Sequence, residues 1–140
     1  MTARFVLLLA CLAGPVAAQS PLAAAAERVR AAWLAHDARA VVGQSSSILL
    51  QLPGADPSSP VGRAQAVELV RRYLRSVVEC SVAVRTVREV EEGKGFVELE
   101  RRYQVVGTSD ERRETVFLGF RRAGDSWVLA GVSLWNTSSF

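Results

Sequence analysis

The sequence predicts an α+β fold in which N-terminal helices pack on an antiparallel sheet. Between residues 20 and 77, apolar residues recur mainly at spacings of three and four, as on one face of a helix. After residue 79 they alternate with polar residues, and turn sequences divide this part into four strands. The chain has 140 residues, 49% hydrophobic and 22% charged, which suits one globular domain and excludes a disordered tail or a collagen-like repeat.

Residues 1–18 are predicted to be a signal peptide that is removed on export. They contain one early cation, Arg4, then an apolar run over 5–12, a Gly-Pro break and small residues at 16–18. The apolar run is too short to span a bilayer as a stable helix. We therefore expect a bacterial protein that is exported, periplasmic or secreted, with residues 19–140 forming its single domain.

The two cysteines bear on this interpretation. Leu8, Leu9, Ala10 and Cys11 loosely resemble a lipobox, but Leu9 is atypical there, so a lipoprotein is not favoured. Cleavage after residue 18 leaves Cys80 without a partner in the chain. We expect Cys80 to be buried, because it opens a valine-rich strand, and a disulfide between two chains is the alternative.

Two helices are expected before residue 45. The first begins with Ser20 as N-cap and Pro21 in the first turn, and runs to about His36. Asp37 is expected to cap a short second helix that ends at Gly43. The stripe of the first helix that should face the core consists of Leu22, Ala25, Ala26, Val29, Ala32 and Trp33.

A strand over 46–52 and a proline-rich loop over 53–60 lead to a third helix over 63–77. This helix places Glu68 four residues before Arg72, a stabilising spacing. Its inward face is expected to hold Ala66, Val67, Val70, Tyr73, Leu74 and Val77.

Four meandering strands are expected over 79–92, 95–106, 112–122 and 127–136. Alternation assigns their side chains to two faces. The face beneath the helices is expected to hold Val82, Val84, Val97, Leu99, Tyr103, Val105, Val116, Leu118, Phe120, Val128, Ala130, Val132 and Leu134. The opposite face is expected to hold Arg85, Glu100, Arg102, Arg113 and Arg121, together with Phe117, Trp127, Leu129 and Trp135.

This order of elements resembles the nuclear transport factor 2-like superfamily. The segment AERVRAAWLAHDARAVV is similar to its opening helix and acidic corner, and ILLQLPG followed by GRAQAVELVRRYL is similar to exported bacterial members of uncharacterised function. The resemblance implies a cone in which a strongly curved sheet wraps around helices. The superfamily includes isomerases, dehydratases, polyketide cyclases, transport adaptors and binding modules, so the resemblance alone selects no function.

Proton-transfer enzymes of this superfamily, such as the ketosteroid isomerases, place a carboxylate base inside the cone. Here Asp37, Asp56, Asp110 and Asp125 all fall at corners or turns, and no glutamate is assigned to the inward face. No buried general base is therefore expected. The single histidine, His36, allows no histidine-based metal cluster or triad and is expected to be a helix-end residue.

Arg101 is the exception on the inward face, because it lies between Leu99 and Tyr103. A two-residue turn at Gly93-Lys94 would place Thr86 opposite it, and the register implied by the later turns would place Phe120 on its other side. A buried guanidinium needs a carboxylate, carbonyls or an anionic ligand. One interpretation is that Arg101 and Tyr103 bind a small carboxylate in the cone. The alternative is a strand bulge, or an arginine that reaches the rim and pairs with a surface acid.

The outer-face residues Phe117, Trp127, Leu129 and Trp135 predict a homodimer interface, unless curvature and the C-terminal tail cover them. The arginines at positions 71, 72 and 75 fit a solvated helix face better than a nucleic-acid site.

The sequence thus favours an exported, non-catalytic binding or interaction module without metal or organic cofactor, taking a small carboxylate or an apolar ligand. No nucleic-acid partner and no stable membrane span are expected. One alternative is a small isomerase or cyclase-like enzyme that uses Tyr103 and Arg101 as donors and an unassigned acid as base. Another is a structural subunit of an envelope complex.

Overall fold

The computed structural model describes residues 19–136, which form three helices and six strands. The predicted signal peptide, with Cys11, lies outside the described residues. In chain order the elements are α1 (Pro21–Leu34), α2 (Ala38–Val42), β1 (Ser47–Gln51), β2 (Val61–Gly62), α3 (Arg63–Arg75), β3 (Val77–Glu91), β4 (Lys94–Val105), β5 (Glu111–Ala123) and β6 (Ser126–Asn136).

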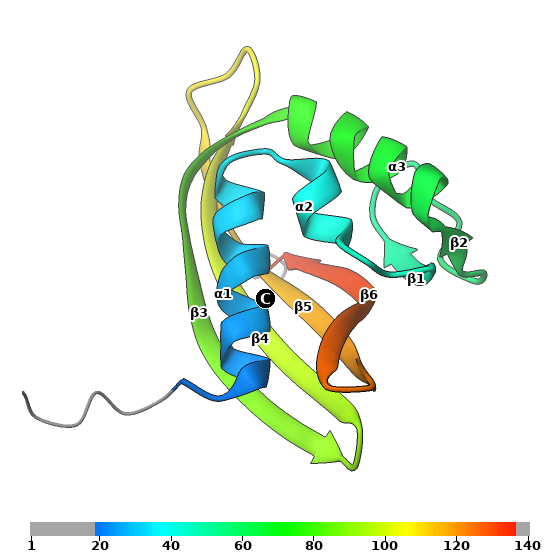
Figure 1. Cartoon of the computed structure of the whole chain (residues 1–140). Helices are drawn as coiled ribbons and strands as arrows, with labels where there is room; N and C mark the ends of the chain where they lie inside the picture. The colour runs from blue at the N-terminus through cyan, green and yellow to red at the C-terminus, as the bar shows by residue number, and fades with distance from the viewer. Residues whose placement is uncertain (1–18, 137–140) are drawn as a thin grey trace, which may run out of the picture.

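The strands make one sheet in the order β2-β1-β6-β5-β4-β3. The meander from β3 to β6 is antiparallel, as predicted, whereas β1 pairs with β6 in parallel. The short strand β2 was not predicted. Figure 1 shows α1 lying across one side of the bent sheet, with α2 and α3 continuing the helical layer. The predicted α+β cone is confirmed.

The predicted helix starts are confirmed by their caps. The Ser20 hydroxyl accepts a hydrogen bond from the Ala23 amide at 3.1 Å, and the Asp37 carboxylate accepts one from Ala40 at the same distance. Between these helices His36 has a φ of +55°, in the left-handed region that side chains rarely adopt. This residue turns the chain from α1 into α2.

The core lies between the helices and the sheet. All six residues of the predicted α1 stripe are buried, as are Ala66, Val70 and Leu74 of α3. The N-terminal part of α1 packs directly on the backbone of β4, because a Cβ added to Gly95 would lie 2.7 Å from Leu22 Cδ1. Any larger residue at position 95 would therefore force the Leu22 side chain to move.

Bulges change which side chains face the core. The pairing of β3 with β4 shifts at three places, and the pairing of β5 with β6 shifts between Gly119 and Phe120. An extra residue in one strand turns the following side chains to the other face. In β6 this buries Trp127 and Leu129 and leaves Val128 and Ala130 only half-buried, so the face predicted for these four residues was wrong.

Among residues 19–136, no helix has the length and apolar character needed to cross a membrane.

Candidate functional site

The centre of the inward face is occupied by a buried arginine between two buried glutamates, which we call the charged cluster. Arg101 on β4 is fully buried. Its Nη2 lies 2.8 Å from Glu79 Oε1 on β3, and its Nη1 lies 3.0 Å from Glu114 Oε1 on β5. The glutamate side chains are 1% and 8% exposed. The alternative in which Arg101 reaches the rim and pairs with a surface acid is therefore wrong. The prediction that no glutamate lies on the inward face is also wrong.

Three aromatic rings surround the guanidinium. Arg101 Cζ lies 3.9 Å from the ring centre of Tyr103, 5.3 Å from that of Tyr73 and 5.4 Å from that of Trp33. Trp33 Nε1 also donates a hydrogen bond to Glu79 Oε1 at 3.0 Å. Cation–π contacts of this kind add to the stabilisation of a desolvated guanidinium.

The two tyrosine hydroxyls connect the arginine to Glu114. Arg101 Nη1 donates to Tyr73 Oη, which lies 3.3 Å from Glu114 Oε1 and donates to it. Tyr103 Oη donates to Glu114 Oε2 at 3.4 Å. Both bonds to the carboxylate are longer than ordinary hydrogen bonds between oxygen atoms. Glu114 is therefore held firmly by Arg101 and only weakly by the tyrosines.

The charged cluster is one positive charge short, since a single guanidinium faces two carboxylates. Burial raises the pKa of Glu79 and of Glu114, and the charge of Arg101 opposes both shifts. Burial also raises the pKa of Tyr73 and Tyr103, which keeps both phenols neutral hydrogen-bond donors. The cluster thus favours a bound proton or another positive charge.

Several buried polar atoms near Arg101 form no hydrogen bond within the part of the chain that the structure describes. They are Glu79 Oε2, His36 Nε2, and Nε and Nη2 of Arg101, the last of which makes only the ion pair. Burial, and then the charge of Arg101, lowers the pKa of His36, so its imidazole is neutral at pH 7. Unpaired buried groups of this kind are the sites where a protein accommodates water or ligand atoms.

Sequence reasoning missed both glutamates, for different reasons. Glu114 lies in phase with Val116, Leu118 and Phe120, so the alternation of β5 could have placed it inside. Glu79 is out of phase with Val82, and only the bulge at Cys80 brings both to the inner face. The same bulge exposes Cys80, which the sequence predicted to be buried.

Of the four residues predicted to form a ligand site, only Arg101 and Tyr103 come together. Val82, not Thr86, stands opposite Arg101, because the turn falls at Glu92 and Gly93 instead of Gly93 and Lys94 and because the register of β3 then shifts twice before Val82. Phe120 stands opposite Gly95, several residues away along β4, and Glu114 takes the place expected for it.

A polar pocket of about 380 Å³ lies against the charged cluster. Tyr73, Tyr103 and Glu114 line it, with Arg112, Val105 and Leu134 among the other walls. Arg101 does not reach this pocket and lies behind the two tyrosines.

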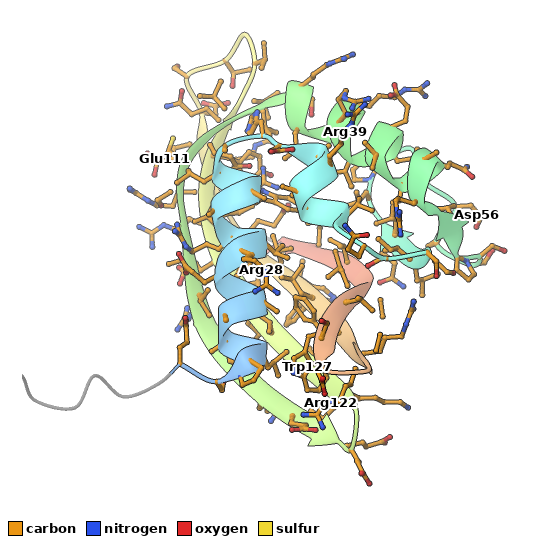
Figure 2. The ribbon with its side chains drawn as sticks, in the orientation of Figure 1. Arg28, Arg39, Asp56, Glu111, Arg122 and Trp127 are labelled. Carbon is orange, nitrogen blue, oxygen red and sulfur yellow. The ribbon has the colours of Figure 1, made fainter. Side chains whose placement is uncertain are left out.

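An apolar groove of about 880 Å³ lies between α1, α2 and the β5–β6 hairpin. Its helical wall contains five alanines, Ala25, Ala31, Ala32, Ala35 and Ala40. Phe120, Trp127 and Leu129 form the opposite wall. Figure 2 shows Arg28 on α1 and Trp127 at the start of β6, which both line this groove.

The outer face of the sheet carries a smaller aromatic patch than predicted, because Trp127 and Leu129 are buried. Phe117 stacks on Phe96 with ring centres 5.6 Å apart, and Trp135 meets Phe117 edge-on at 6.4 Å. Trp135 is 55% exposed. We call these three residues the outer aromatic patch.

Solved structures with the same arrangement identify the fold. A ketosteroid isomerase-like protein from Erwinia carotovora atroseptica superposes with a TM-score of 0.69 at 18% identity, covering 84% of this chain and 94% of that one. The chain has the nuclear transport factor 2-like fold. A Catenulispora acidiphila protein of ketosteroid isomerase-like fold, solved in complex with trimethylamine, matches with a TM-score of 0.62 at 13% identity, covering 82% and 86%.

A protein of the DUF4783 family from Bacteroides ovatus matches with a TM-score of 0.61 at 10% identity, covering 78% of this chain and 92% of that one. No protein-family model and no curated protein matches the sequence. Identities this low establish the nuclear transport factor 2-like fold and not an activity. Within residues 19–136, no group of three or more histidine, cysteine or acidic side chains is arranged to hold a metal ion.

Proposed function

We propose that this nuclear transport factor 2-like protein is an exported, non-catalytic binding protein that holds an apolar small molecule in the apolar groove. The observation that carries the proposal is the groove of about 880 Å³, a size in the range of small-molecule sites. Apolar walls with a few polar groups are typical of such sites.

The groove exists because of the side chains that α1 and α2 present to the β5–β6 hairpin. Alanine methyl groups leave space between the helices and the aromatic wall, where larger residues would fill it. Arg28, Asp37 and Gln44 supply the polar groups of the lining. The groove therefore suits an elongated apolar body with one polar group.

The charged cluster argues against the small carboxylate that the sequence suggested as a ligand of Arg101. Two glutamates already neutralise the guanidinium, and a third carboxylate would add an uncompensated buried charge. Of the two ligand classes that the sequence suggested, the structure therefore favours the apolar one.

Fluorescence of 1-anilinonaphthalene-8-sulfonate tests the proposal. We expect the dye to bind the folded protein at one site, and the Ala35→Phe variant, which fills the groove, to reduce its affinity at least about tenfold. Ala64→Phe is the matched control, because Ala64 is an exposed alanine of α3 that does not line the groove. Equal dye binding by both variants would contradict the proposal.

General acid–base catalysis is a second candidate, because the structure puts Glu114 with a raised pKa at a pocket lined by two tyrosine hydroxyls. An enzyme of this kind would exchange α-protons of small ketones in D₂O, and Glu114→Gln would abolish the exchange. If the unmodified protein exchanges no α-protons, acid–base catalysis is excluded and binding is the function that remains.

Export and dimerisation complete the proposal. N-terminal sequencing of the protein recovered from the periplasm or medium should begin at Gln19. The outer aromatic patch supports a homodimer, since an exposed Trp135 beside two half-buried phenylalanine rings suits an interface.

A further inference from the structure

We infer that the polar pocket is a second ligand site, distinct from the apolar groove, and that it takes a compact zwitterion with an ammonium group and a carboxylate joined by a short apolar chain. The inference rests on the distribution of charge around the pocket and not on the apolar groove.

The floor of the pocket calls for a positive charge. Glu114 lines the pocket, and its side chain is only 8% exposed. Arg101 neutralises one of the two carboxylates of the charged cluster, which leaves one negative charge without a partner. Burying an unpaired charge is costly, so a ligand ammonium group at Glu114 would restore neutrality.

Glu114 also has free capacity to accept hydrogen bonds. Within residues 19–136, its Oε1 accepts from Arg101 and Tyr73, whereas its Oε2 accepts only from Tyr103, at 3.4 Å. A carboxylate oxygen can accept two hydrogen bonds. An ammonium group has three donors and could bind Oε2 without displacing Arg101.

A positive charge lies at the other side of the pocket. Arg112 precedes Glu114 by two residues on β5, so both side chains leave the same face of the strand, with backbones about 7 Å apart. Arg112 is exposed and forms no ion pair with any residue of the range 19–136. A ligand carboxylate would pair with this guanidinium.

Apolar side chains line the pocket between these groups. Val77, Val105 and Leu134 contribute walls that can contact a short methylene chain. A pocket with Glu114, Arg112 and an apolar wall between them should favour a zwitterion. Arg112 would repel a simple amine, and Glu114 would repel a simple acid.

Calorimetric titration of the full mature chain with three probes of equal length tests the inference. We expect 4-aminobutyrate to bind, butylamine to bind at least about tenfold more weakly, and butyrate not to bind. The Glu114→Gln variant should lose both amines. Arg112→Gln should lower the affinity for 4-aminobutyrate to that for butylamine. Glu111→Gln, an exposed acid of the same strand that pairs with Arg102, should change nothing.

The inference is overturned if butyrate binds as well as 4-aminobutyrate, if no probe binds at millimolar concentration, or if Arg112→Gln leaves the order of affinities unchanged. The last result decides the matter even if Glu114→Gln does not fold, because Arg112 is exposed. Ala35→Phe should not affect 4-aminobutyrate binding, so the groove and the pocket can succeed or fail separately.

Discussion

The apolar groove and the charged cluster lie at the two ends of the same inner face of the sheet. The groove is open, whereas the cluster is closely packed. Along β5 the inward residues run from Glu114 to Phe120. At the Phe120 end, alanines leave about 880 Å³ open. At the Glu114 end, large polar and aromatic side chains close around Arg101. Apolar walls can border an empty space, whereas buried charges must contact partners.

Breaking the charged cluster should have the largest effect on stability. Arg101→Met leaves two buried carboxylates without their cation, and we expect the free energy of unfolding to fall by about 3–5 kcal/mol in urea titrations at pH 7. Arg102→Met, which removes an exposed arginine paired with Glu111, should cost less than about 1 kcal/mol. A similar loss in both variants would show that Arg101 contributes no more than a surface ion pair.

The second-largest effect is expected from the two tryptophans of β6, Trp127 and Trp135, which were both predicted to lie on the outer face. Replacing each by alanine compares the groove side of the sheet with its outer face. Trp127→Ala removes a wall of the apolar groove from a buried position, and we expect a loss of about 3–5 kcal/mol. Trp135→Ala should cost less than about 1 kcal/mol, because Trp135 is exposed. Instead it should weaken the proposed homodimer, measured by sedimentation. Equal losses of stability would contradict the burial of Trp127 relative to Trp135.

The pH dependence of stability tests the charge imbalance and has the smallest expected effect. Burial raises the pKa of Glu79 from its ordinary value of 4.5, so the folded state holds the proton more tightly than the unfolded state. This contribution is present at low pH and is lost as the pH rises from 4.5 through the pKa of the folded state. Glu79→Gln, which resembles the protonated acid, should remove this loss.

Comparing the stability of Glu79→Gln with that of the parent isolates the contribution of Glu79 from those of the other groups that titrate. His36 acts in the opposite direction, because its lowered pKa makes its contribution fall as the pH decreases below 6.5. Glu114 acts in the same direction as Glu79. In the difference between variant and parent, measured from pH 4 to pH 8, the slope should reach at most about 1.4 kcal/mol per pH unit. Parallel curves would show that folding does not change the pKa of Glu79.

Much of the fold could be predicted, and less of the site. The caps at Ser20 and Asp37, the apolar stripe of α1 and the four-stranded meander were all readable, because each depends on residues close in sequence. The inward position of Arg101 followed from alternation and is confirmed. Of its partners, Glu79 could not be found because the bulge at Cys80 sets its register, whereas Glu114 lies in phase with the apolar residues of β5 and was missed although alternation could have placed it inward.

The sequence by itself determined the order of elements, the alanine-rich face of α1 and the presence of a cation inside the sheet. Only the tertiary structure decided that Glu79 and Glu114 neutralise that cation and that Trp127 turns inward. The physical reason is that a single extra residue, at Cys80 or at Ala130, reverses the face of every side chain on one side of it. Such a residue is stabilised by the neighbouring strand and leaves no local pattern.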